Sequence, residues 1–275
     1  MPVRGLSRIR GVLVAAAVIA VALVLVTPAL AAENPDGVAV IIGNQDYLGG
    51  LPKVEFARND AAAMKTFVVE RLGFRIGNII DLSDATQAEM EAAFGNERTH
   101  QGKLWRWLRP GKSDVVVFYS GHGVPGRDGQ RGYLLPVNAD PDAPEINGYP
   151  IDLLLANLAK LEARSVTVYL DACFSGESAG GTLSKTKGLN VSPRLPQATS
   201  GITVLTAASG SQVAFWDTES KHGLFTRYLL DALYGAADGE GYGDGDGAVT
   251  VAETWVTFSR PPIAGEVSLS GRLRH

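Results

Sequence analysis

Two short segments of the sequence combine a reactive side chain with the features of a strand end. Cys173, the only cysteine in the chain, follows the β-branched, apolar run 165–170. His122 lies between two glycines, follows the similar run 114–119 and precedes the cysteine by 51 positions. A neighbouring imidazole can generate a thiolate from a thiol and later protonate a leaving amine. We therefore identify His122 and Cys173 as a candidate catalytic dyad for nucleophilic attack on a carbonyl group.

Each of these residues alone has a simpler interpretation. A lone cysteine is usually a small buried hydrophobic residue, and a lone histidine is more often a satisfied core group. Both residues, however, end a buried strand in a glycine-rich break, which favours the dyad. Open α/β sheets place their sites at the carboxyl ends of parallel strands. Glycine lets the backbone approach a substrate closely, so the amides of Gly123 and Cys173 are candidate donors to an oxyanion.

The first 31 residues predict a targeting segment. Arg4, Arg8 and Arg10 precede an uncharged apolar run, 11–26, which is followed by the small residues Pro-Ala-Leu-Ala-Ala. This order is typical of a signal peptide, and we favour cleavage after Ala31 with export to the periplasm or the medium. The alternative is an uncleaved membrane anchor, because the run approaches the ~20 residues that a spanning helix needs.

The remaining chain, of roughly 240 residues, suits one α/β domain. Apolar runs at 38–43, 114–120, 165–171 and 202–207 alternate with helical patterns such as 151–161, which predicts a mostly parallel sheet with helices on both faces. The net charge of −4 gives no basic patch, so nucleic acid is not expected as a partner. A single cysteine can form no internal disulfide, and in an exported protein this favours a reactive role for Cys173.

Residues 119–123 (Tyr-Ser-Gly-His-Gly) and 171–176 (Asp-Ala-Cys-Phe-Ser-Gly) resemble the histidine and cysteine boxes of the caspase-like cysteine peptidases, in the metacaspase and bacterial branch. The similarity extends over about residues 38–260, with 261–275 as a C-terminal tail. It implies the caspase-hemoglobinase fold, a mostly parallel six-stranded sheet flanked by helices. It also implies a cysteine endopeptidase that needs no cofactor for its chemistry. Ala172 and Phe174 depart from the residues that are frequent in metacaspases, and place the chain among the bacterial relatives.

Three polar residues match the specificity pocket of metacaspases. Residues two apart in a strand face the same way, so Asp171 should project beside Cys173 and Ser120 beside His122. The resemblance adds Asp60 to these two. Two carboxylates favour a guanidinium or ammonium group, which predicts protein or peptide substrates cut after Arg or Lys. The alternative for Asp60 is a helix N-cap.

The segment after the cysteine changes character. Residues 177–200 are rich in Gly, Ser, Thr, Lys and Pro and predict a loop. In caspase-like peptidases a large and a small subunit are separated in this region, so Lys185, Lys187 and Arg194 are candidate self-cleavage positions; an unprocessed loop is the alternative. The same resemblance implies that residues 209–212 and Trp216 form the cleft rim and that residues 222–226 form a helix start. For His222 itself we expect a structural role.

A glycine and acid run near the end, 238–247, suggests calcium as an activator, with Asp244, Asp246 and Glu253 as ligands. The match to a calcium loop is incomplete, because Tyr242 occupies its first position. The alternative is a turn followed by a capping box from Thr250 to Glu253. Two other functions are open: a catalytically silent caspase-like domain that binds partners, and a calcium-responsive surface module.

Overall fold

The computed structural model describes residues 33–127, 129–174, 177–178, 181–183, 201–207 and 216–259. The predicted signal segment and the tail 261–275 lie outside these residues. None of the helices within the described ranges is long and apolar enough to cross a membrane.

A parallel sheet of five strands forms the centre of the described domain. Its order is β10-β7-β3-β1-β2, and every neighbouring pair is parallel. The three inner strands are largely apolar runs because helices cover both faces of the sheet. They are β1 (Val38–Gly43), β2 (Ile79–Ser83), β3 (Asp114–Ser120), β7 (Ser165–Asp171) and β10 (Ile202–Thr206). The predicted fold class is confirmed. The family resemblance implies six strands in the central sheet, and within the described residues this sheet has five.

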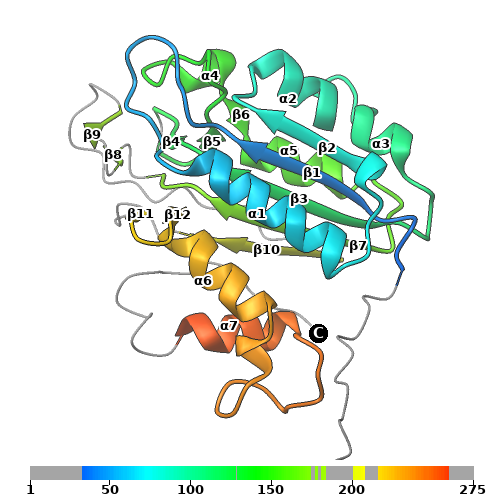
Figure 1. Cartoon of the computed structure of the whole chain (residues 1–275). Coiled ribbons are helices and arrows are strands. Elements are labelled where there is room, and N and C mark those ends of the chain that lie inside the picture. The colour runs from blue at the N-terminus through cyan, green and yellow to red at the C-terminus, as the bar shows by residue number, and fades with distance from the viewer. Residues whose placement is uncertain are drawn as a thin grey trace, which may run out of the picture. The chain divides into compact units, whose positions relative to one another are not determined.

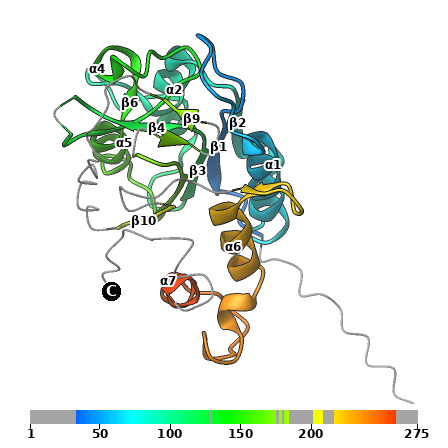
Figure 2. The same ribbon diagram turned by 90° about the vertical axis from the view of Figure 1, so that its left-hand side faces the viewer.

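Helices cover both faces of this sheet, which alternate along each strand. Ala39 and Ile41 of β1 pack toward α1 (Ala57–Glu70) and α6 (Leu224–Leu233). Val38, Val40 and Ile42 pack toward the other layer. That layer consists of α2 (Gln87–Phe94), α3 (Lys103–Trp107) and α5 (Ile151–Leu158). Figure 1 shows α1 in front of the strands and α6 below β10, and the turned view of Figure 2 separates both helices from α2 and α5.

Smaller elements connect or follow the main strands and helices. An antiparallel sheet joins β4 (Gly123–Pro125), β5 (Gly132–Leu134) and β6 (Tyr149–Pro150), with the short helix α4 (Pro144–Asn147) between the last two. Two hairpins pair β8 (Glu177–Ser178) with β9 (Gly181–Thr182), and β11 (Trp216–Asp217) with β12 (His222–Gly223). The remaining elements are two 3-10 turns, η1 (Ile76–Asn78) and η2 (Ala236–Asp238), and the helix α7 (Val251–Ser259).

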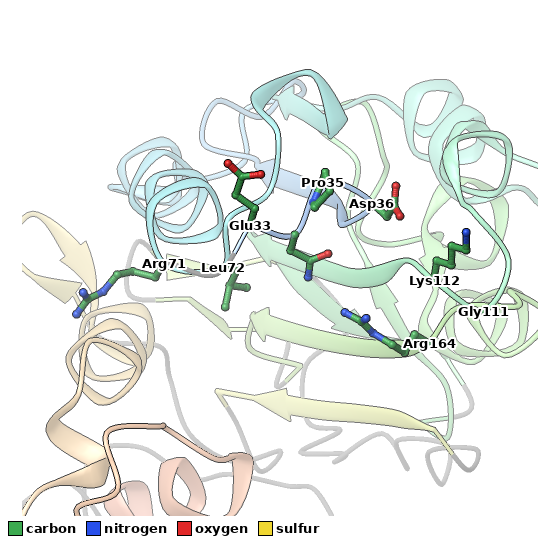
Figure 3. Close-up of a pocket in the computed structure, with 9 residues that line it drawn as sticks. Glu33, Pro35, Asp36, Arg71, Leu72, Gly111, Lys112 and Arg164 are labelled. Carbon is green, nitrogen blue, oxygen red and sulfur yellow. The ribbon is translucent and has the colours of Figure 1, made fainter. Parts of the chain in front are cut away.

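A surface pocket of about 520 Å³ lies at the amino ends of the strands. It is lined by residues that precede β1, β3 and β7 or follow α1: Glu33, Asn34, Pro35, Asp36, Arg71, Leu72, Gly111, Lys112 and Arg164. Figure 3 shows Arg71 and Leu72 on one side of this pocket and Lys112 and Arg164 on the other. Because His122 and Cys173 follow the carboxyl ends of the same strands, this pocket is separate from the candidate dyad.

Candidate active site

The histidine and cysteine segments leave the sheet side by side. Strands β3 and β7 are parallel neighbours, and their register pairs Ser120 with Asp171. The pairing continues past the strand ends, where the Gly121 amide donates to the carbonyl oxygen of Asp171 at 3.2 Å. His122 and Cys173 therefore follow adjacent strand ends, as the sequence predicts.

Gly123 lies directly against the cysteine segment. A methyl group at this position would stand 2.4 Å from the Phe174 ring and 2.9 Å from the carbonyl oxygen of Cys173. Only a residue without a side chain fits so close an approach. The two proposed oxyanion donors thus belong to backbone segments in contact with each other, and Cys173 itself is buried, with 7% of its surface exposed.

The backbone of His122 is fixed on both sides. Its amide donates to the Tyr47 hydroxyl at 2.7 Å, and its carbonyl oxygen accepts from the Leu135 amide at 3.0 Å and from the Tyr119 hydroxyl at 2.8 Å. Gly121 leaves room for both tyrosines, since a methyl group there would come within 2.8 Å of each hydroxyl oxygen. The histidine therefore has little freedom of position.

The ring of His122 has two further neighbours, and both come from the segment between β1 and α1. Its Nε2 atom lies 2.8 Å from the carbonyl oxygen of Pro52, and its centroid is 4.5 Å from that of the Tyr47 ring. A carbonyl oxygen only accepts, so Nε2 carries a proton and Nδ1 is the basic nitrogen of the neutral ring. Burial lowers the pKa of His122 to about 4, although the Pro52 carbonyl acts in the opposite direction. The imidazole is accordingly neutral at pH 7, the form required of a general base.

The three predicted pocket residues also come together. The Ser120 hydroxyl donates to Oδ2 of Asp60 at 3.0 Å. Asp60 lies inside α1, whose N-cap position is Phe56, so the alternative of an N-cap role for this carboxylate is wrong. A methyl group at Gly223 would stand 2.5 Å from Oδ2 of Asp171 and 3.0 Å from Oδ2 of Asp60, so both carboxylates border one small space.

Burial and mutual repulsion shape the charge of this pair. Burial raises the pKa of Asp60, against the opposing effect of its hydrogen bond to His222. Burial and the nearby Asp60 charge raise the pKa of Asp171 to about 7, although the Thr226 hydroxyl and amide both donate to its Oδ2. Two carboxylates in a shared buried site resist ionising together. A cationic ligand between them would relieve this repulsion.

The comparisons with known proteins agree with this arrangement. The family model described as "Caspase domain" matches residues 36–244. The chain belongs to the caspase domain family. This is a family of cysteine peptidases, which act on protein substrates. A search of curated proteins found no match.

Two solved structures resemble the caspase domain of this chain. One is the crystal structure of protein GSU0716 from Geobacter sulfurreducens, with 20% identity, a TM-score of 0.56, and coverage of 86% of this chain and 92% of that chain. The other is caspase-1 from Spodoptera frugiperda, with 15% identity, a TM-score of 0.48, and coverage of 74% and 70%. The first of these supports the fold.

The acidic run near the end of the caspase domain differs from the predicted calcium set. Carboxylate oxygens of Asp238, Asp244 and Glu253 lie within 4.8 Å of one another, whereas Asp246 is not a member of this cluster. Its Oδ1 accepts from the Ala248 amide. The loop instead uses its acids to hold its own backbone, since Asp238 accepts from two glycine amides.

The alternative prediction for this region, a capping box at the start of α7, is confirmed. The Thr250 amide and hydroxyl both donate to Oε2 of Glu253, and the Glu253 amide donates back to the Thr250 hydroxyl at 3.2 Å. Glu253 therefore has a structural function that is independent of any metal.

Several predictions fall on parts of the caspase domain outside the described residues. Of the predicted loop 177–200, the structure describes only the β8–β9 hairpin and Leu183. Lys185, Lys187, Arg194 and the rim 209–212 lie outside these ranges.

The sequence did not indicate the partners of His122. Tyr47 and Pro52 lie 75 and 70 positions before it. A backbone carbonyl leaves no trace in a sequence, and Tyr47 has the appearance of an ordinary aromatic loop residue. The contact of the Thr226 hydroxyl with Asp171, at 2.6 Å, depends on the docking of α6 and has no counterpart in a local sequence pattern.

Proposed function

We propose that the chain is a cysteine endopeptidase in which Cys173 is the nucleophile and His122 the acid and base. The Sγ atom of Cys173 attacks the carbonyl carbon of the scissile bond, and its proton passes to Nδ1 of His122. The same proton goes to the leaving amine as the C–N bond breaks, which leaves a thioester. Water then hydrolyses the thioester with His122 as base, and the thiol is restored.

One observation carries this proposal: the pairing of Ser120 with Asp171 places the segments of His122 and Cys173 at adjacent strand ends. Three others support it. His122 is held by its backbone and ring, its Nδ1 atom is basic because Nε2 faces the Pro52 carbonyl, and the Gly123 and Cys173 segments are in contact. The amides of these last two residues are the proposed donors to the oxyanion.

We further propose cleavage after Arg or Lys. Ser120 is hydrogen-bonded to Asp60, and Asp171 borders the same small space beside Gly223. Ser120 and Asp171 each stand two residues before a member of the dyad, and a cation would stabilise two carboxylates buried together. A guanidinium group meets this need with several hydrogen bonds in fixed directions.

The alternative is a caspase-like domain that binds peptides without cleaving them. The low exposure of His122 and Cys173, 3% and 7%, favours it, because a substrate needs access to both. Calcium as an activator is a separate proposal; of its predicted ligands, Asp244 and Glu253 lie in one acidic cluster with Asp238, and Asp246 is not a member of that cluster.

One assay separates these functions. Purified protein is incubated with fluorogenic peptides that differ only in Arg, Lys, citrulline or Asp before the scissile bond, with and without calcium, beside Cys173→Ala. Cysteine-dependent release after Arg and Lys alone is the expected result. Release after Asp or citrulline at the same rate as after Arg and Lys contradicts the acidic pocket. If folded protein releases nothing from any peptide, the binding domain is favoured.

Export and self-processing complete the proposal. Residues 1–31 would be removed on export, and Lys185, Lys187 and Arg194 follow the nucleophile in a lysine-bearing segment that suits the proposed specificity. Mass spectrometry of the protein made in its host should find an N-terminus at Ala32 and internal ends after these residues. The internal ends should be missing in Cys173→Ala, while the new N-terminus persists.

A further inference from the structure

His222 is bound to the acidic pocket in a way that its sequence position did not suggest. It stands on β12, 162 positions after Asp60, and its Nδ1 atom lies 2.8 Å from Oδ1 of that carboxylate. Its side chain is 24% exposed, whereas the Asp60 side chain is 1% exposed. The imidazole thus lies between a buried acid and the solvent.

Among the described residues, three donors contact Asp60 while this contact exists. Its Oδ1 accepts from the Gly223 amide at 3.1 Å besides pairing with His222, and its Oδ2 accepts from the Ser120 hydroxyl at 3.0 Å and the same amide at 3.3 Å. The amide and the hydroxyl belong to fixed backbone and a buried strand end. The imidazole is the only one of these three donors on a side chain that reaches solvent, so it is the one that can leave.

We propose that His222 is a specificity-determining residue, whose imidazole occupies Asp60 in the unliganded protein and is displaced from it by the cationic side chain of the substrate. This inference rests on the proposed function, because it concerns the pocket that is to select Arg or Lys. In this exchange the cationic group of the substrate takes the place of the His222 imidazole at Asp60.

The charges around His222 determine how strongly its imidazole competes for Asp60. The hydrogen bond to Asp60 raises the pKa of His222, and the charge of Asp231 on α6 adds to the effect. Asp217, its antiparallel neighbour on β11, is paired with Arg227 of α6. The remaining acid of the site, Asp171 on β7, borders Gly223.

Displacement has a consequence that can be measured. An imidazole that leaves Asp60 loses the interaction that raises its pKa, so binding of a cation must lower the pKa of His222. Linkage is reciprocal, so protonation of His222 must weaken binding of the cation. An uncharged ligand of the same shape should do neither.

The test uses Cys173→Ala, which binds without turnover, and the probes Nα-acetyl-arginine amide and Nα-acetyl-citrulline amide. The chain contains four histidines, so their ring NMR signals are few, and His222→Asn assigns the one of interest. We expect saturating arginine probe to lower the pKa of His222 and the citrulline probe to leave it unchanged. We also expect the arginine probe to bind about 5-fold or more tightly at pH 8 than at pH 6.

His222→Asn supplies the second measurement, because its amide can donate to Asp60 but cannot become charged. In the Cys173→Ala background it should bind the arginine probe more tightly than the parent at pH 6 and equally at pH 8. The titration of Asp171 is common to both proteins and cancels in this comparison. His100→Asn, whose ring contacts Trp105, is the matched control and should behave as the parent.

The outcomes separate the two proposals. Binding of the arginine probe with an unchanged His222 pKa, and with equal affinity in His222→Asn, overturns the displacement alone. Failure of folded protein to distinguish the arginine from the citrulline probe at either pH overturns the acidic pocket as well.

Discussion

His122 donates a hydrogen bond from Nε2 to the carbonyl oxygen of Pro52 across 2.8 Å. The contact fixes the tautomer of the neutral ring and directs its lone pair, on Nδ1, to the other side. Pro52 and Tyr47 belong to the segment that joins β1 to α1, so this segment sets the chemistry of a histidine that follows β3.

The first prediction concerns the protonation of His122. Burial lowers its pKa to about 4, so the ring should remain neutral as the pH falls from 8 to 5 and gain a proton only near pH 4. NMR titration of the four histidine rings, with His122→Asn for assignment, measures this directly. A His122 signal that titrates near pH 6.5 would show that water reaches the ring.

The second prediction separates two contributions of Tyr47. Tyr47→Phe keeps the ring against the imidazole but leaves the His122 amide without its acceptor, so kcat should fall about tenfold with the pKa of His122 unchanged. Tyr47→Leu also removes the covering ring, so the pKa should rise toward 6.5. Thermal unfolding of both variants checks the fold. Equal His122 pKa values in the two variants would contradict a covering function for the ring.

The third prediction concerns the space at Gly123. Gly123→Ala places a methyl group against the Phe174 ring and the Cys173 carbonyl, which should displace an oxyanion donor and lower kcat about 100-fold. Phe174→Leu in the same protein should restore only part of the loss, because the backbone contact persists.

Gly77→Ala is the matched control for this substitution, since a methyl group at Gly77 meets nothing within 4 Å. It should retain full activity. Full activity in Gly123→Ala would show that the segments separate freely and that the proposed donors are not fixed.

The sequence predicted the elements that have a regular hydrophobic pattern. The strands β1, β3, β7 and β10 are apolar runs whose bounds follow from their composition, and the residues just beyond β3 and β7 are those expected to react. Because β3 and β7 are parallel neighbours, His122 and Cys173 follow the same carboxyl edge of the sheet, and the strand prediction alone is enough to expect this.

The remainder depends on how distant segments dock. His222 was expected to be structural, and its bond to Asp60 arises only when the β11–β12 hairpin packs on α1. Asp60 also showed an ambiguity that sequence could not resolve, because an aspartate near a helix start is equally suited to a cap and to a site. Its position inside α1, with its side chain toward Ser120, decides the matter.

The last prediction uses Asp171, whose pKa is raised to about 7 by burial and by the Asp60 charge. Between about pH 4 and 7 the native protein retains a proton on this carboxyl that the unfolded chain loses, so this group lowers the free energy of unfolding as the pH rises. Asp171→Asn has no such proton, and its amide oxygen can still accept from Thr226. The variant should therefore gain stability relative to the parent from pH 4 to 8, by on the order of 1–4 kcal/mol.

Chemical denaturation of both proteins across this range measures the difference. Glu162→Gln, an exposed position, controls for the loss of one negative charge and should show no such trend. A constant difference between Asp171→Asn and the parent would mean that Asp171 is ionised in the folded protein throughout. Asp171 would then carry its negative charge already at pH 5, and its repulsion of the Asp60 carboxylate would act over the whole range in which Asp60 is ionised.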